Sequence, residues 1–420
     1  MNVIIVGAGI GGLTLALFLE RARVACRIYE AAPQIQPVGV GINILPHASK
    51  AFAELGVDAA LMRAAILTRE AVFFNRFGQL IYRELLGRYA GYDQPQYSVH
   101  RAELQRVLLE AVAERLGADA VVTGRKCVAI EQDPNGVVAQ FQSAATGEPL
   151  LEARADLAVG CDGLHSTVRK LLHPREGPPL YSGVNMWRGV SVWPPILSGA
   201  SMIRAGWLKT GKMVIYPIRD NVDTQGRQLV NWVAELETPR HSNRDWNRVG
   251  SIDDFIGAFE DWHFDWLDVP ALIRSAEMVL EFPMVDQDPL PWWSRGRITL
   301  MGDAAHPMYP RGSNGAGQAI LDARTLAQAL GSHQDPIEAL KSYEAERLPF
   351  TANVVQMNRR SPPDAILREV FERTGDKPFA RVEDVISERE LVALSESYKR
   401  VAGLDRESLK APAQVILQRS

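Results

Sequence analysis

The hydrophobic pattern near the N-terminus consists of two short apolar runs separated by an amphipathic stretch. Residues 3–6 are continuously apolar and are followed at once by a glycine, which is typical of a buried parallel strand. Residues 10–23 carry apolar side chains at helical spacing, and residues 25–29 form a second apolar run. The pattern therefore predicts a strand–helix–strand unit over residues 3–29.

Similar elements are predicted further along the chain. Apolar residues at helical spacing predict a helix over 101–116. Two more apolar runs, 155–159 and 297–301, predict buried strands, and each is followed closely by a glycine and an aspartate. We expect further helices over 316–330 and 336–347.

The middle of the chain has a different pattern. Residues 183–193, 212–218 and 228–237 are rich in β-branched and aromatic residues and are separated by turn residues, which predicts an antiparallel sheet. Most of the tryptophans in this region are expected to be core, with an aromatic pocket as the alternative. Residues 361–420 are charged and weakly periodic, and we expect short helices and a loose tail there.

A glycine motif lies between the first predicted strand and helix. It fits the pattern GxGxxG, in which the glycines permit a tight turn, close approach of a pyrophosphate, and helix–strand packing. A helix N-terminus offers free N–H groups to phosphates, and Glu30 at the end of the next strand can accept hydrogen bonds from ribose hydroxyls. The motif predicts a dinucleotide site, the alternative being a glycine turn without a ligand. Its residues are Gly7, Gly9, Gly11, Gly12 and Glu30.

Composition narrows the functional classes. The chain has 420 residues and a net charge of -4, which argues against a nucleic-acid binder because no basic excess is present. Its three cysteines are far apart, so neither a disulfide framework nor a zinc site is expected. No run of apolar residues is long enough for a membrane span, and no signal peptide is recognised. A cytoplasmic protein without a metal is therefore expected.

Two further motifs follow in order. One is Gly160-Cys161-Asp162-Gly163 with Ser166 and Val168-Arg169, and the other is Gly302-Asp303-Ala304-Ala305-His306-Pro307 with Pro310, Gly312 and Gly315, ending at Asp322. Together with the glycine motif they resemble the class A flavoprotein aromatic hydroxylases, the family of para-hydroxybenzoate and salicylate hydroxylases. The resemblance runs from residue 1 to about residue 360. Segments 39–44, 95–101, 186–189 and 283–290 are similar to those of the flavin hydroxylases of phenazine biosynthesis.

The resemblance implies an α/β fold with a Rossmann-like FAD-binding domain and an inserted, mainly antiparallel substrate sheet. The expected division is 1–180 with 280–330 for the FAD domain, 181–279 for the substrate domain, and 331–420 for C-terminal helices and tail. It also implies that NADH or NADPH reduces FAD, and that O2 then yields a flavin C4a-hydroperoxide. That species hydroxylates a small aromatic or heteroaromatic substrate, with or without decarboxylation.

The resemblance assigns cofactor contacts beyond the glycine motif. They are Val40, Gly41, Arg101, Asp162, Asp303, Gly312, Gly315 and Ala316. Other readings stay open: a helix cap for Asp303, a turn residue for Asp162, and a surface charge for Arg101. His306 belongs to the motif and is usually structural in the family. Family members often carry Asn or Ser near position 317, where this chain has Gly317.

No catalytic side chain is expected, because the flavin performs the chemistry. The substrate pocket is expected between the antiparallel sheet and the flavin. Its candidates are Trp187, Arg188, Tyr216, Trp232, Met308, Tyr309 and Pro310. Arg188 would either pair with a substrate carboxylate or form a salt bridge at the rim of the pocket.

Two alternatives to a hydroxylase remain from the sequence. An NAD-dependent dehydrogenase would use the glycine motif but leaves the motifs at Asp162 and Asp303 unexplained. A non-catalytic flavin-binding sensor is the other. The expected state is a monomer or homodimer.

Overall fold

A parallel sheet forms the first half of the fold. The computed structural model describes residues 1–35, 39–238, 248–360 and 362–410. Five parallel strands follow the order β21-β12-β1-β2-β8. Their bounds are β1 Asn2–Val6, β2 Ala25–Tyr29, β8 Val121–Val122, β12 Leu157–Gly160 and β21 Ile298–Leu300.

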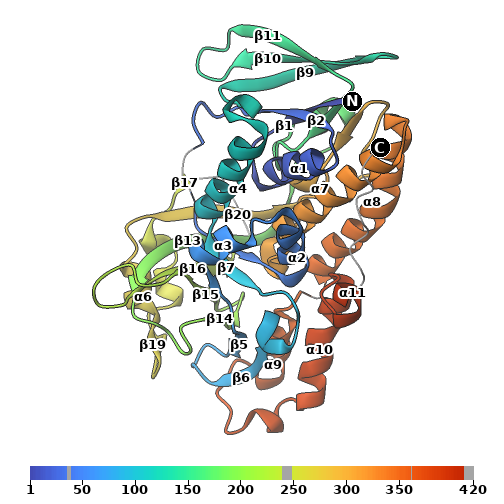
Figure 1. Ribbon diagram of the computed structural model, residues 1–420. Helices are drawn as coiled ribbons and strands as arrows, with labels where there is room; N and C mark the ends of the chain where they lie inside the picture. The colour runs from blue at the N-terminus through green and yellow to red at the C-terminus, as the bar shows by residue number, and fades with distance from the viewer. Residues whose placement is uncertain (36–38, 239–247, 361, 411–420) are drawn as a thin grey trace.

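Layers cover both faces of this sheet (Figure 1). On one face α1 (Ile10–Arg21) packs between α4 (Arg101–Leu116) and α7 (Gly315–Ser332). On the other lies an antiparallel meander of β9 (Arg125–Asp133), β10 (Gly136–Ser143) and β11 (Pro149–Ala155), where Phe141 stacks on Tyr29. The apolar runs of the sequence are therefore buried from both sides, as parallel strands require.

An eight-stranded sheet forms the second half, in the order β17-β20-β13-β16-β15-β14-β5-β6. All its pairings are antiparallel except that of β14 with β5. The bounds are β5 Glu70–Phe74, β6 Leu80–Leu85, β13 Leu180–Trp193, β14 Ser201–Trp207, β15 Gly211–Arg219, β16 Gln228–Glu237, β17 Arg248–Val249 and β20 Val279–Asp286.

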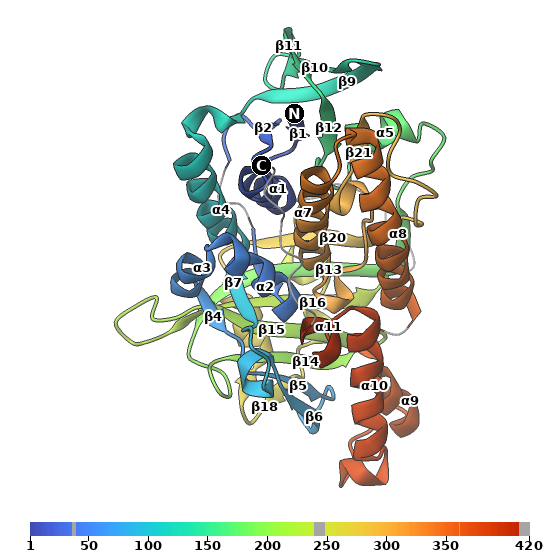
Figure 2. The same ribbon diagram turned by 45° about the vertical axis from the view of Figure 1, so that its right-hand side comes forward.

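The two faces of the large sheet have different neighbours. An aromatic core lies between one face and residues 250–279, which include β18 (His263–Phe264), β19 (Leu267–Asp268) and α6 (Val269–Arg274). The other face is turned toward the parallel-sheet half, and a small sheet of β3 (Gly41–Ile44), β7 (Tyr97–His100) and β4 (Ala65–Leu67) packs on it. Figure 2 shows this stacking of the small sheet on β15.

The remaining helices pack on one half or the other. They are α2 Pro46–Leu55, α3 Asp58–Ala64, α5 Thr167–Leu172, α8 Pro336–Arg360, α9 Ala365–Thr374, α10 Glu388–Val401 and α11 Arg406–Lys410. Helix α5 packs on β9 and β12, and α9 packs on β14 and β5. Helix α8 runs beside α7 and continues past the large sheet toward α10 (Figure 2). No helix in the described part of the chain has the length and apolar character needed to cross a membrane.

The predicted fold class is confirmed, with two differences in detail. The helix expected over 336–347 is α8, which continues through Pro349 to Arg360 because its second half is buried by packing. The large sheet also takes β5 and β6 from the segment assigned to the FAD domain, and most of β20 comes from beyond residue 279. Residues 411–420 of the expected tail lie outside the described residues.

Candidate cofactor and substrate site

The glycine motif turns the chain from β1 into α1 at the carboxyl edge of the parallel sheet. Gly7 has a φ of +107°, and a side chain there would lie 2.6 Å from the carbonyl oxygen of Cys161. A side chain on Gly12 would collide with the carbonyl oxygen of Gly7. Around Gly9, in contrast, the space is open. Gly7 and Gly12 are therefore needed for packing within the protein, while Gly9 leaves room for a ligand.

The open space at Gly9 belongs to a cleft of about 490 Å3. The carboxylate of Glu30 lies in its wall and accepts hydrogen bonds from the backbone N–H groups of Ala8 (2.7 Å) and Ala32 (2.8 Å). Gly9 at the N-cap of α1 has no side chain to cap the helix, so among the described residues its first N–H groups have no side-chain partner and can bind an anion. The lining residues are Gly9, Glu30, Ala32, Pro33, Gln34, Ile35 and Gln105. Gly11 lies at the back, facing Met301.

Asp162 acts within the protein as a cap for α5. Its carboxylate accepts hydrogen bonds from the Ser166 hydroxyl and from the N–H groups of Thr167 (2.6 Å) and Val168 (3.2 Å). Burial raises the pKa of this carboxyl, and the hydrogen bonds oppose that shift. Asp162 thus has a local role as a helix cap, which differs from the turn residue considered from the sequence, and it lies beside Gly7 of the first motif.

Arg169 connects the second motif to the third. It is buried, and its guanidinium donates to the carbonyl oxygens of Ala304 (3.0 Å) and Ala305 (2.8 Å). Both carboxylate oxygens of Glu176 pair with the same guanidinium. Arg169 is therefore a buried residue whose hydrogen bonds hold the loop after β21 in place, and it is not a charge on the helix surface.

Asp303 is the exposed member of that loop. It lies in a 3-10 turn over Gly302–Ala304, and its carboxylate makes no hydrogen bond to any residue that the structure describes. A side chain on Gly315 would lie 3.7 Å from its Oδ1 atom, so the carboxylate is next to the start of α7. It does not cap a helix, and its oxygens remain free to accept hydrogen bonds.

The N-terminus of α7 is tightly enclosed. The side-chain position of Gly312 is occupied by the hydroxyl of Tyr398 from α10, and the carboxamide of Asn358 bonds to that hydroxyl (2.9 Å) and to the Tyr309 carbonyl (3.1 Å). Gly315 and Ala316 form the first turn, and the N-cap residue Asn314 provides no side-chain cap. Among the described residues, the first N–H groups of this 18-residue helix thus have no side-chain partner.

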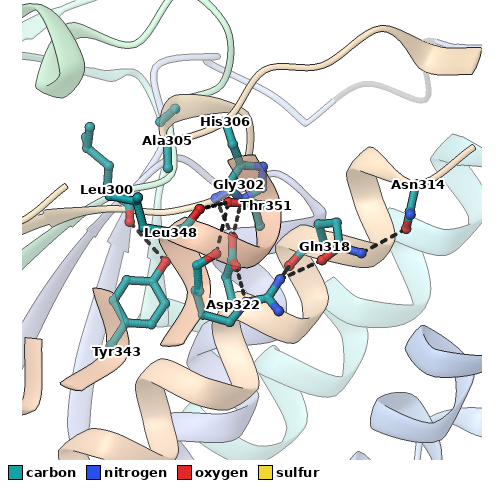
Figure 3. A network of polar contacts seen from close by, with 12 residues as sticks. Leu300, Gly302, Ala305, His306, Asn314, Gln318, Asp322, Tyr343, Leu348 and Thr351 are labelled. Atoms are coloured by element: carbon teal, nitrogen blue, oxygen red, sulfur yellow. Dashed lines mark hydrogen bonds and ion pairs between the residues drawn. The ribbon is translucent and has the colours of Figure 1, made fainter. Parts of the chain in front are cut away.

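Behind this terminus lies a buried polar network (Figure 3). The two oxygens of Asp322 bind Nε2 of His306 (2.5 Å) and Nε of Arg347 (2.7 Å), and the first oxygen also accepts from the Gly302 N–H (3.0 Å). Burial favours the neutral carboxyl, but His306 and Arg347 outweigh it and lower the pKa of Asp322 to about 2. His306 is therefore part of a structural network.

Several predicted residues meet where the small sheet packs on the large one. The Gly41 carbonyl accepts a hydrogen bond from Nη2 of Arg188 (2.9 Å), and a side chain on Gly41 would lie 2.6 Å from the Tyr216 ring. The carbonyl of the buried Val40 accepts from the N–H of Arg101, whose side chain is exposed. Arg101 lies close enough to help lower the pKa of Arg188, although burial is the larger cause.

Trp187 and Trp232 do not join this group. Trp187 stacks on Phe255 at 5.0 Å between ring centroids, and the Trp232 indole donates to Ser191 (3.1 Å) in the same aromatic core. Successive residues of a strand point to opposite faces, so Trp187 and Arg188 cannot share one. The pocket prediction for these two tryptophans is corrected by their position on the far face of the sheet.

The last three pocket candidates lie on the loop before α7. Met308 packs against Val354 and Val355 of α8, and the ring of Tyr309 packs against the large sheet near Met284. Pro310 is exposed at the start of a 3-10 turn. The loop therefore contacts both α8 and the sheet.

Sequence reasoning missed four polar residues at this junction. They are His47, Asn231, Asn314 and Arg347. Each is buried and polar; Asn314 lies within the third motif but was not singled out there, and the other three have no recognisable motif around them. Asn231, for example, accepts a hydrogen bond from the Gly41 N–H (2.7 Å), a contact across 190 residues that no local pattern reveals.

The residues present fit an elongated dinucleotide. One end offers a cleft with free helix N–H groups and the Glu30 carboxylate, and the other offers the uncapped α7 terminus. At the second end, Nδ2 of Asn314 and both ring nitrogens of His47 are buried polar atoms without a hydrogen bond to a described residue. Among described residues, no cluster of His, Cys, Asp and Glu is arranged for a metal ion.

Comparison with known proteins agrees with this geometry. The family model described as "FAD binding domain" matches residues 1–230 and 283–358. Phenazine 1,6-dicarboxylic acid hydroxylase PhzS of Lysobacter antibioticus is 41% identical over 95% of this chain and 97% of its own length. 3-Amino-4-hydroxybenzoate 2-monooxygenase PtmB3 of Streptomyces platensis is 34% identical over 86% of each chain.

A solved structure shows the same fold. HpxO of Klebsiella pneumoniae, crystallised with FAD and uric acid, superposes with a TM-score of 0.75 and 24% identity over 95% of this chain and 96% of its own. The chain therefore belongs to the FAD-binding-domain family and is an FAD-dependent aromatic monooxygenase that uses NAD(P)H and O2.

Proposed function

We propose that the substrate is an aromatic or heteroaromatic carboxylate, held by Arg188. The observation that carries this proposal is a half-buried guanidinium, with its Nε atom fully buried, that has no carboxylate partner among the described residues. Its contacts are the Gly41 carbonyl and the neighbouring Tyr216 hydroxyl, while Nε has no partner. A salt bridge at the rim, the other possibility for Arg188, is not formed within the described residues.

Physical chemistry favours an anion at this position. A buried cation is costly unless it is paired, and a guanidinium binds a carboxylate through two parallel hydrogen bonds. Arg101 adds positive charge nearby and so increases the attraction for an anion. The named substrates of the two relatives, phenazine 1,6-dicarboxylic acid and 3-amino-4-hydroxybenzoate, are aromatic carboxylates.

The proposed contacts to FAD follow the two ends of the site. The glycine loop and Glu30 bind the adenosine and pyrophosphate, Arg101 pairs with a phosphate, and Asp303 accepts from a ribityl hydroxyl. The loop from Gly312 to Ala316 faces the ring. Bound FAD supplies the redox and oxygen chemistry, and the protein orients the substrate and excludes water.

The test replaces Arg188 and compares two substrates that differ only in charge. We expect Arg188→Met to raise KM for an aromatic carboxylate about 100-fold, because truncating one partner of a buried charge pair costs several kcal/mol. Arg188→Lys should lose less, since it retains the charge. Steady-state NAD(P)H oxidation provides the measurement.

The carboxamide analogue of the same ring is the matched control and should show little change. Equal losses for both substrates would contradict the proposal, as would an unchanged KM for the carboxylate. FAD content of each variant is measured alongside, so that loss of cofactor is not mistaken for loss of substrate binding.

We further propose a cytoplasmic location and a monomeric or homodimeric state. The location is supported by the three free cysteines, none of which is in a disulfide.

A further inference from the structure

His47 is a buried histidine whose ring contacts Asn314, although neither ring nitrogen makes a hydrogen bond of good geometry to a described residue. It is the second residue of α2 and only 5% exposed. Its ring lies against the N-terminus of α7, where Nδ2 of the buried Asn314 is also unpaired. Buried polar atoms are normally hydrogen-bonded, so two such side chains beside an uncapped helix indicate a missing ligand.

The imidazole occupies the space that a side chain at position 317 would take. A Cβ atom on Gly317 would lie 2.5 Å from Nε2 of His47 and 3.3 Å from Oδ1 of Asn314. Glycine inside a helix is less stable than alanine by about 1 kcal/mol. The lack of space for a side chain beside His47 explains why glycine stands at position 317.

The polar network fixes the direction of Asn314 (Figure 3). Its Oδ1 accepts from Nε2 of Gln318 (3.0 Å), whose Oε1 accepts from Nη2 of Arg347 (2.6 Å). Arg347 is held in turn by Asp322. Because the carboxamide oxygen is engaged, the free Nδ2 atom is a donor available to a ligand.

The His47 ring is neutral. Burial and the charge of Arg347 lower its pKa to about 3, with Asn314 opposing the shift. A neutral imidazole carries one N–H donor and one acceptor nitrogen. Beside the free N–H groups of α7, this site offers donors to the polar edge of a ring and favours negative charge on it.

We infer that His47 is a flavin-positioning residue, which with Asn314 provides the polar side-chain contacts to FAD that Gly317 lacks. His47 and Asn314 would add to the FAD contacts proposed above, and this role rests on FAD binding at the α7 end of the site. Since the flavin ring gains negative charge when it is reduced, these contacts hold reduced FAD more tightly than oxidised FAD.

The first experiment measures FAD binding and its midpoint potential in His47→Ala. We expect the Kd for oxidised FAD to rise about tenfold, the effect of losing one hydrogen bond in a buried site. The Kd for reduced FAD should rise tenfold more, which lowers the two-electron potential by about 30 mV. His173→Ala is the matched control, because that histidine bonds to the Trp292 carbonyl away from the site (3.1 Å).

The second experiment is a double-mutant cycle with Gly317→Ala. Alone, this change pushes the imidazole away and should raise the Kd for FAD. In the His47→Ala background the added methyl group enters free space, so it should cost nothing further. If His47→Ala fails to fold, His47→Asn replaces it in both experiments and, by keeping an amide donor, should retain part of the binding.

Unchanged FAD affinity and potential in a folded His47 variant would overturn the inference. So would an equal effect of Gly317→Ala in both backgrounds, because the two positions would then be independent. A loss of thermal stability without a change in potential would assign His47 a merely structural role and also contradict it. None of these readouts depends on the substrate, so failure here is separate from failure of the Arg188 proposal.

Discussion

Single residues of the glycine loop have separable tasks. Gly12 is enclosed by the protein itself, because a side chain there would meet the Gly7 carbonyl, whereas Gly9 faces the open cleft with a φ of -70° that alanine also adopts. We therefore expect Gly12 to be required for folding and Gly9 for binding of the ligand.

Substitution by alanine should separate these tasks. Gly12→Ala is expected to lower the free energy of unfolding by about 2–3 kcal/mol through overpacking. Gly9→Ala should leave it within about 0.5 kcal/mol of wild type, yet weaken FAD binding at least about tenfold by filling the cleft. Urea unfolding of the FAD-free protein and FAD titration measure the two effects. Equal stability of both variants would show that the packing at Gly12 is described wrongly.

Individual residues also show where sequence reasoning ends. The alternation along β13 places Arg188 and Trp187 on opposite faces, and this correction was available from the sequence alone. The roles of His47 and Arg347 could not be predicted from the sequence, because each depends on contacts with residues of other helices. A lone histidine in a sequence has no pattern around it.

At the scale of elements, α7 and α8 are joined by the carboxylate of Asp322. It is fully buried between His306 and Arg347, and it also binds the backbone of the loop after β21. Because its pKa is lower in the folded protein, the free energy of unfolding depends on pH. The ordinary value is 3.8 and the folded value about 2, so the charged form stabilises the fold above pH 3.8 and this contribution is lost as the pH falls toward 2.

Replacement of this carboxylate tests the network. Asp322→Asn should lower the free energy of unfolding by about 3–5 kcal/mol at pH 7, because it leaves Arg347 buried without its partner. The difference from wild type should shrink below pH 3.8. Urea unfolding across pH 2–7 checks both, with the exposed Asp253→Asn as control. A difference that does not change with pH would contradict the assigned pKa.

Elements were predictable where their pattern is local. The helix over 101–116 is observed with the predicted bounds, and the strand over 25–29 likewise. Two other features could not be predicted, because they depend on packing between distant segments. They are the extension of α8 beyond residue 347 and the pairing of β5 with β14. The three motifs predicted the cofactor class, and the contacts between them required the structure.

At the scale of the whole molecule, function depends on how the two halves meet. The small sheet of β3, β7 and β4 and the loop before α7 lie between the parallel sheet and the large one. A buried cluster of ion pairs joins the large sheet to the start of α9. It consists of Lys212, Glu235, Asp364 and Arg204. Helix α10 then closes on Gly312 through Tyr398. The loop before α7 is thus held by the large sheet at Tyr309 and by α10 at Gly312.

The most direct test of the account is the fate of molecular oxygen. The holoenzyme is supplied with NAD(P)H, an aromatic carboxylate and 18O2, and the product is analysed by mass spectrometry. We predict one 18O atom in each hydroxylated product, with oxidation of one NAD(P)H per product. NAD(P)H oxidation that yields only hydrogen peroxide, across a panel of aromatic carboxylates and without labelled product, would contradict the account.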